Sequence, residues 1–243
     1  MNYKIAYSAC QGTAHLEQGM PCQDAVAGHC TDNGAVIVLA DGAGSCQFAE
    51  LGANTVTQAV EKLLSQWCDD PAFDDSTLNT AGIIKCCTQA LAQNMLPLEE
   101  QACTLLFCAV RGDGAYILGH IGDGYAFFFD GEESQLLSDA ENGEALNETY
   151  FITGPTAEKH LRLQTGTLQP GQAVILCSDG AGDALFDRQT RACAGAVGLM
   201  ARWLQAHPEE DVSAALTSNM DAVMRSRTFD DMSIALLTTI KDL

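Results

Sequence analysis

The chain has 243 residues, of which 47% are apolar and 18% charged, a composition that excludes a disordered or fibrous protein and can build a sizeable core. Its 12 Lys and Arg residues stand against 32 Asp and Glu residues, which gives a formal net charge of −20. A field of that sign repels phosphate backbones and anionic lipid, so we expect neither nucleic acid nor a membrane as a partner.

The cysteines indicate a reducing compartment. There are eleven of them, an odd and scattered set, and several lie inside apolar runs, as Cys103, Cys108 and Cys177 do. The N-terminus lacks the pattern of a signal peptide, and no apolar run approaches the roughly 18–20 residues that span a bilayer. We therefore expect reduced, mostly buried thiols in a cytoplasmic protein.

In chain order, the pattern of apolar residues predicts a mixture of strands and helices. Strands are expected over 4–8 and 35–40, helices over 49–67 and 78–95, and strands over 104–110, 115–121 and 126–129. A strand over 173–177, helices over 193–206 and 211–224, and a strand over 233–240 complete the series. The segment 131–172 is the least regular part, and an irregular stretch of that length is usually a lid or a binding loop.

The grouping of these elements predicts the fold class. The runs 35–40, 104–110 and 173–177 are apolar almost without alternation, which is typical of strands buried on both faces. Arg111-Gly-Asp-Gly114 is a good hairpin turn between two strands, and the helices come in pairs. Neighbouring strands and paired helices favour an α+β protein with antiparallel sheets and helices packed outside them. We expect one domain over 1–243.

One phrase occurs twice. Val36-Ile-Val-Leu-Ala-Asp-Gly-Ala-Gly44 and Val174-Ile-Leu-Cys-Ser-Asp-Gly-Ala-Gly182 each place Asp-Gly at the end of an apolar strand. An Asp there directs its carboxylate into a crevice, and the Gly lets the backbone approach closely enough for its carbonyl to act as a ligand. A single Asp-Gly would be read as an ordinary turn. The repetition favours a functional site.

Further acidic residues have the same context. Asp123 lies in Gly122-Asp-Gly124 after a strand, Asp230-Asp231 precedes the last strand, and Gln23-Asp24 precedes another apolar stretch. Together they supply hard oxygen ligands, which suit Mg²⁺ or Mn²⁺ better than Zn²⁺ or Cu²⁺. Several carboxylates share one crevice only when cations neutralise them.

The order of these motifs resembles the PPM (type 2C) metal-dependent serine/threonine phosphatases over nearly the whole chain. The series runs Gln-Asp-Ala, Asp-Gly-x-Gly, a Thr-bearing strand, Gly-Asp-Gly, Ser-Asp-Gly and Asp-Asp-x-Ser. The variant Gly12-Thr-Ala-His15 followed by Gly19-Met-Pro-Cys-Gln-Asp-Ala25 further resembles a bacterial subgroup of small stand-alone members. The fold implied is a central β-sandwich of two antiparallel sheets flanked by pairs of α-helices, in α-β-β-α layers.

The resemblance also implies roles for individual residues. Asp41 would bridge two Mn²⁺ or Mg²⁺ ions, and a hydroxide bridging the same ions would attack phosphorus in a phosphoserine or phosphothreonine of a protein. A third ion is also allowed. The other metal-binding positions would be the Gly42 carbonyl, Asp179, Asp230, Asp123, Gln23 through water, and Asp24 beside it. Asp231 would take the place of a supporting Asn, and Thr104 would have a structural role.

Two positions depart from the family's pattern. Ala43 stands where the family has the histidine often assigned as general acid, and the phosphate-binding arginine would fall near Gly19. His15 is the candidate substitute for either function, although a lone His near a Gly-rich turn is more often merely solvated. His120 lies inside a strand and is expected in the core.

Three functions are therefore open. The first is a monomeric phosphatase that acts on a phosphorylated protein and opposes a cognate Ser/Thr kinase. The second is a pseudophosphatase that binds a phosphoprotein without turnover, which the loss of the His and the Arg would favour. The third, a hydrolase of small phosphate esters, ranks last because 131–172 offers few basic residues for a nucleotide.

Overall fold

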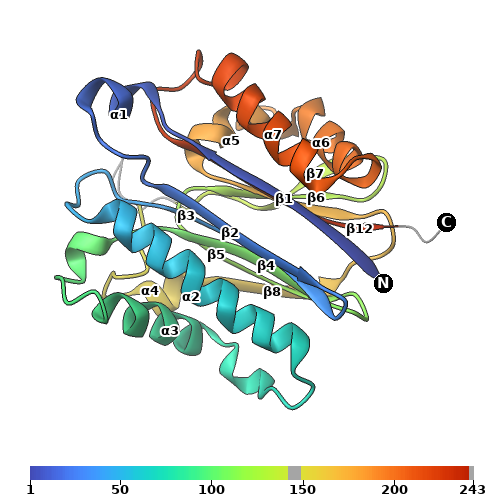
Figure 1. Ribbon diagram of the computed structural model, residues 1–243, viewed down its shortest axis with the longest axis horizontal. Coiled ribbons are helices and arrows are strands. Elements are labelled where there is room, and N and C mark those ends of the chain that lie inside the picture. The colour runs from blue at the N-terminus through green and yellow to red at the C-terminus, as the bar shows by residue number, and fades with distance from the viewer. Residues whose placement is uncertain (142–148, 241–243) are drawn as a thin grey trace.

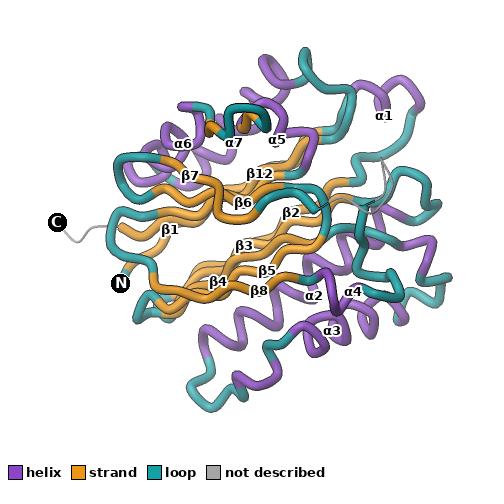
Figure 2. The backbone as a smooth tube through the Cα atoms, turned by 180° about the vertical axis from the view of Figure 1, so that it is seen from behind, coloured by secondary structure: helices purple, strands orange, loops and turns teal. Residues whose placement is uncertain are grey.

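The computed structural model describes residues 1–141 and 149–240. In it, two five-stranded antiparallel sheets stack face to face, and helices cover both outer faces (Figure 1). Seen from behind, the same four layers follow one another from the α6 and α7 side to the α2 and α3 side (Figure 2). The predicted α+β sandwich with paired outer helices is confirmed.

The first sheet joins strands from both ends of the chain. Its order is β1 (Asn2–Cys10), β12 (Met232–Ile240), β9 (Ala173–Cys177), β6 (Tyr125–Phe129) and β7 (Ser134–Ser138). Strand β12 lies between β1 and β9 and pairs with β1 in an unbroken register from Asn2↔Ile240 to Cys10↔Met232. The outer face of this sheet packs against α5 (Asp179–Leu185), α6 (Gly195–Ala206) and α7 (Glu209–Asn219). A π-helical turn at Met220–Met224 follows α7.

The second sheet contains the first Asp-Gly strand. Its order is β2 (Asp24–Thr31), β3 (Gly34–Asp41), β4 (Leu105–Arg111), β5 (Ala115–Ile121) and β8 (Arg162–Thr167). The predicted turn at Arg111–Gly114 joins β4 to β5, and Gly114 has a φ of 89°. The helices α2 (Ala49–Asp69) and α3 (Thr80–Ala92) cover its outer face. Short elements complete the fold: α1 (Thr13–Gln18), α4 (Ala157–His160), 3-10 turns at Asp75–Thr77 and Glu99–Gln101, and the small hairpin β10 (Phe186–Asp187) with β11 (Ala192–Cys193).

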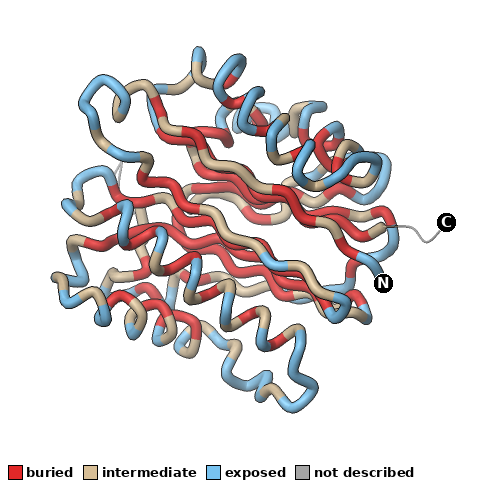
Figure 3. The backbone as a smooth tube through the Cα atoms, in the orientation of Figure 1, coloured by how far each residue is buried: buried red, intermediate tan, exposed pale blue. Residues whose placement is uncertain are grey.

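Apolar side chains form three clusters, one between the sheets and one under each helical layer. The cluster between the sheets includes Ile37 and Leu39 of β3, Leu106 of β4 and Leu176 of β9, none of which has exposed area. Figure 3 shows the result, with buried strands through the centre and exposed positions on the outer helices. The predicted burial of β3, β4 and β9 on both faces is confirmed.

The segment 131–172 is more regular than predicted. It contains β7, α4 and β8, and β8 pairs with β5 from Ala115↔Thr167 to His120↔Arg162. Residues 142–148 of the expected loop lie outside the described residues. The prediction failed because β8, with the sequence RLQTGT, is a partly exposed edge strand without an apolar alternation. Among the described residues, no helix is both long enough and apolar enough to cross a membrane.

Candidate active site

The two Asp-Gly phrases meet at one end of the sandwich, one from each sheet. Asp41 is the last residue of β3, and Asp179 is the first residue of α5, directly after β9. Both glycines are packed against backbone: a Cβ on Gly42 would lie 2.8 Å from the Ala49 carbonyl oxygen, and one on Gly180 would lie 2.1 Å from that of Asp231. Glycine is therefore required after each Asp for the strand ends to come together.

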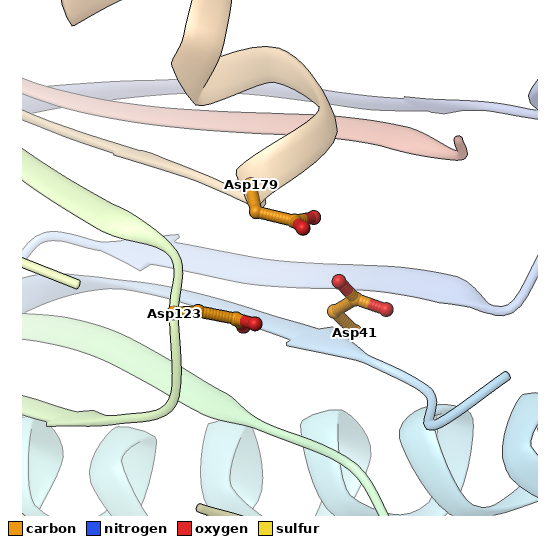
Figure 4. Close-up of side chains that lie close together, drawn as sticks. All are labelled: Asp41, Asp123 and Asp179. Carbon is orange, nitrogen blue, oxygen red and sulfur yellow. The ribbon is translucent and has the colours of Figure 1, made fainter. Parts of the chain in front are cut away.

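Asp123 joins this pair from the loop that passes from β5 in one sheet to β6 in the other. Gly122, with a φ of 115°, allows the chain to turn there. One carboxylate oxygen from each of Asp41, Asp123 and Asp179 lies within 4.8 Å of the other two. Figure 4 shows the three side chains pointing toward one another from their separate elements.

Burial and mutual repulsion make this cluster costly to ionise. Burial, reinforced by the charges of neighbouring aspartates, raises the pKa of Asp41 well above its ordinary value. Burial and the charges of Asp123 and Asp230 raise the pKa of Asp179 to about 6. The pKa of both carboxyls would fall if a cation occupied the space between them.

Asp230 and Asp231 reach the cluster from the start of β12. Asp230 is exposed and lines the same cavity as Asp41 and Asp179. Asp231 is 2% exposed, and its carboxylate accepts hydrogen bonds from the backbone N–H groups of Gly12 (2.6 Å) and Gln23 (2.5 Å). It therefore fixes the N-terminal segment against the end of the sandwich.

Gln23 and Asp24 are both buried but differ in their relation to the cavity. Gln23 lines the cavity, and its side-chain oxygen is buried without a hydrogen-bond partner among the described residues. Asp24 pairs with Asp41 in the register of β2 and β3 and is not among the described residues that line the cavity. Burial raises the pKa of Asp24 to about 7, although the hydroxyls of Ser233 and Ser178 oppose the rise. That Gln23 and Asp24 contribute to metal binding stays a prediction.

Thr104 fixes Asp41 from the neighbouring strand. Its Oγ1 accepts a hydrogen bond from the Asp41 backbone N–H at 2.9 Å, and its own N–H donates to the Asp41 carbonyl at 2.8 Å. The side chain is 2% exposed, so both bonds are shielded from water. This geometry matches the structural role expected for Thr104.

The cavity above the cluster has a volume of about 180 Å³. The described residues that line it are His15, Gln23, Asp41, Gly42, Ala43, Gly44, Thr104, Asp123, Thr149, Phe151, Asp179, Asp230 and Asp231. The sequence did not single out Thr149 or Phe151, whose only signal was their position in the segment 131–172. Thr149 Oγ1 donates to Asp123 Oδ2 at 2.6 Å and so orients that carboxylate.

His120 is not among the described residues that line the cavity. It is fully buried, as expected from its position in a strand, and burial lowers its pKa to about 3.

These residues fit divalent cations. No lysine or arginine is among the described residues that line the cavity, and the histidine there, His15, pairs with Asp231 and not with Asp41, Asp123 or Asp179 in the described contacts. The available donors are carboxylate, carbonyl and amide oxygens, which are the ligands that Mg²⁺ and Mn²⁺ prefer. The unpartnered oxygen of Gln23 and the raised pKa values of Asp41 and Asp179 are what a cation site would show without its ions.

Comparison with known proteins places the chain in a family. The sequence model of the family described as Protein phosphatase 2C matches residues 11–221. Serine/threonine-protein phosphatase 3 of Escherichia coli (strain K12) is 28% identical over 176 residues, 69% of each chain. Among solved structures, the Mycobacterium tuberculosis serine/threonine phosphatase PstP/Ppp superposes with a TM-score of 0.65 at 18% identity, covering 99% of this chain and 100% of that one. The catalytic domain of PstP in complex with two manganese ions gives 0.68 at 20% identity, covering 98% and 99%. These structural likenesses show the fold, and the sequence match, which covers most of the chain, shows that this protein belongs to the protein phosphatase 2C family and is a phosphatase.

Proposed function

We propose that the protein hydrolyses phosphoserine and phosphothreonine in other proteins with the help of two divalent cations, Mn²⁺ or Mg²⁺. The observation that carries this proposal is the convergence of Asp41, Asp123 and Asp179, from both sheets, within 4.8 Å at the floor of an open cavity. The name of the Escherichia coli relative supports the serine/threonine specificity, and the manganese complex of PstP supports the cation.

Each residue would have a definite part in that chemistry. Asp41, the Gly42 carbonyl, Asp179 and Asp230 would hold the principal cations, and Asp123 would hold a third, with Gln23 and Asp24 in support. Bound cations would lower the pKa of water and polarise the phosphoryl group. Thr149 orients the Asp123 carboxylate and Thr104 holds the Asp41 backbone, so this part of the site is arranged before a substrate binds, which favours electrostatic stabilisation of the transition state.

A phosphoprotein-binding module without turnover is the second candidate. Ala43 in the first Asp-Gly phrase favours this binding module, since its side chain transfers no proton. So does Gly19, which ends α1 with a φ of 65°, a conformation that favours glycine over a phosphate-binding arginine. The family match and the intact aspartates favour the enzyme.

The two candidates are separated by one set of assays. Purified protein would be tested on an aryl phosphate and a phosphothreonine peptide, with Mn²⁺, Mg²⁺ or EDTA. Asp41→Ala should abolish turnover, whereas Asp32→Ala, an exposed position in the β2–β3 turn, should leave it unchanged. Protein that binds Mn²⁺ and the phosphopeptide but releases no phosphate would establish the binding module instead.

The remaining features of the proposal concern context. The eleven cysteines are all unpaired, which supports a reducing compartment and hence the cytoplasm. The shared apolar interior between the sheets supports a single domain over residues 1–243, and the proposed state is a monomer. The partner is a phosphorylated protein, with a cognate Ser/Thr kinase acting in the opposite direction.

A further inference from the structure

Helix α1 places His15 over the cation site. His15 lines the same cavity as Asp41, Asp179 and Asp230, and its side chain is 14% exposed. The helix is attached at its start, where the Ala14 N–H donates to the Phe229 carbonyl at 3.0 Å. His15, which the sequence offered as a candidate substitute for the missing histidine or arginine, therefore lines the site.

Asp231 sets the orientation of that imidazole. Its Oδ2 lies 2.9 Å from His15 Nδ1, and its two oxygens also accept the N–H groups of Gly12 and Gln23. Asp231 Oδ2 already accepts the Gln23 N–H, and a proton on His15 Nδ1 lets the same oxygen accept from the ring as well. Nε2 is then the nitrogen that remains for the cavity, and the carboxylate balances the charge of the ring when both nitrogens are protonated.

The chemistry requires a proton donor there. A seryl or threonyl alkoxide is a poor leaving group, and Ala43 has no proton to give. Among the described residues that line the cavity, His15 is the only histidine, and none is a lysine, arginine, tyrosine or cysteine. His15 is therefore the ring best suited to protonate the leaving oxygen.

We propose that His15, held by Asp231, is the general acid of the reaction, a role that rests on the proposed phosphatase function. The oxygen of a water molecule bonds to phosphorus while the bond between phosphorus and the seryl or threonyl oxygen breaks, and the protons of that water stay on the phosphate product, which releases them to solvent according to its own acidity. The electron pair of the broken bond stays on the leaving oxygen, which takes the proton from Nε2. Neutral His15 then regains a proton from solvent. Asp231 is a positioning residue, because it acts through the ring.

The test compares leaving groups that differ in their need for a proton. For His15→Gln, kcat/KM on a phosphoserine peptide should fall by about 10²-fold or more, within the range of general acid catalysis. An aryl phosphate that releases an acidic phenol needs little protonation of the leaving oxygen. The decrease in kcat/KM of His15→Gln on that substrate should therefore be at least about tenfold smaller. Across a series of aryl phosphates, the rate should depend more steeply on phenol acidity in the variant than in the wild type.

Three further readouts complete the experiment. Asp231→Asn should reproduce the selective loss more weakly, and His29→Gln, at an exposed position of β2, should change neither substrate. In metal-free protein with a neutral ring, NMR should find the His15 proton on Nδ1. Equal losses on both substrates, no loss on either, or a proton on Nε2 would overturn the role of His15. A wild type that turns over neither substrate would instead contradict the phosphatase assignment itself.

Discussion

Thr104 shows how a single hydroxyl can hold the end of strand β3 in place beside the acidic cluster. Thr104→Val keeps the shape but leaves the buried Asp41 N–H without its acceptor, at a cost of about 1–3 kcal/mol. We expect a lower denaturant midpoint and weaker Mn²⁺ binding, measured by chemical unfolding and by calorimetry. Thr104→Ser keeps the hydroxyl and serves as the control. Equal affinities in the Val and Ser variants would show that the hydrogen bond does not position Asp41.

Asp41 is a residue where function and stability conflict. Its pKa is raised by burial and by neighbouring aspartates, so its charge opposes folding when no cation is present. Asp41→Asn should reduce turnover by more than about 100-fold, since even supporting residues of metal sites contribute 10–100-fold. In EDTA at pH 8, the same variant should unfold at a higher temperature than the wild type, by about 2–4 °C for each kcal/mol recovered. An unchanged or lower melting temperature would mean that the carboxylates repel one another little.

At the scale of elements, the junction of α5 with β12 depends on Gly180. A Cβ at this position would lie 2.1 Å from the Asp231 carbonyl oxygen, so Gly180→Ala must move α5, which carries Asp179, away from the segment Asp230–Asp231 that leads into β12. We expect a loss of about 1–3 kcal/mol in the free energy of unfolding, together with most of the activity. Gly195→Ala, near the start of α6 with no atom within 4 Å of its Cβ, should instead stabilise by about 0.4–1 kcal/mol. Similar effects of the two substitutions would contradict this account.

The elements also show how far the sequence could lead. Strands β3, β4 and β9 were predictable because burial on both faces leaves an unbroken apolar run. Edge strands β2 and β8 were not predicted, since partial exposure removes that signal. Helix α5 was also missed, because its sequence DGAGDAL reads locally as a turn. The Asp-Gly phrases identified the floor of the site, but Thr149 and Phe151 arrive from a segment with no periodicity, and only the tertiary fold brings them there.

For the whole molecule, the acidic cluster links stability to pH. Burial raises the pKa of Asp24 to about 7 and that of Asp179 to about 6, above the ordinary value near 4 in the unfolded chain. The folded, metal-free protein therefore binds these protons more tightly than the unfolded chain does. This contribution to stability is fully present below about pH 4 and is lost as the pH rises through about 6 to 7.

Cations should reverse that loss. Because they favour the ionised carboxylates, the rise in melting temperature on adding Mn²⁺ should be larger at pH 8 than at pH 5.5. Thermal unfolding with Mn²⁺ or EDTA at both pH values measures how much the rise in melting temperature depends on pH. The Asp41→Asn variant should show a smaller dependence. A rise that does not depend on pH would contradict the coupling.

The net charge of −20 should influence which substrates arrive fastest. Phosphopeptides with Lys or Arg beside the phosphoresidue should have a higher kcat/KM than the same peptides with Glu, since the protein's field attracts them. The ratio of the two kcat/KM values, basic peptide over acidic peptide, should fall as ionic strength rises from about 0.01 M to 0.15 M. Over this range the Debye length falls from about 30 to 8 Å, so the protein's charges are screened. A ratio independent of salt would point to direct contacts instead.

Asp41 belongs to one sheet and Asp179 follows a strand of the other. The thickness of the apolar layer between the sheets therefore sets the distance between these two carboxylates. A methylene removed from that layer should alter cation affinity without touching a ligand. Ile37→Val removes this group from between the sheets, and Ile83→Val removes it from α3, in the cluster on the outer face of the second sheet. Both positions are fully buried, and each substitution should lower the free energy of unfolding by about 0.5–1.5 kcal/mol. Only the first should change the dissociation constant for Mn²⁺, a result that would make the packing between the sheets a determinant of cation affinity.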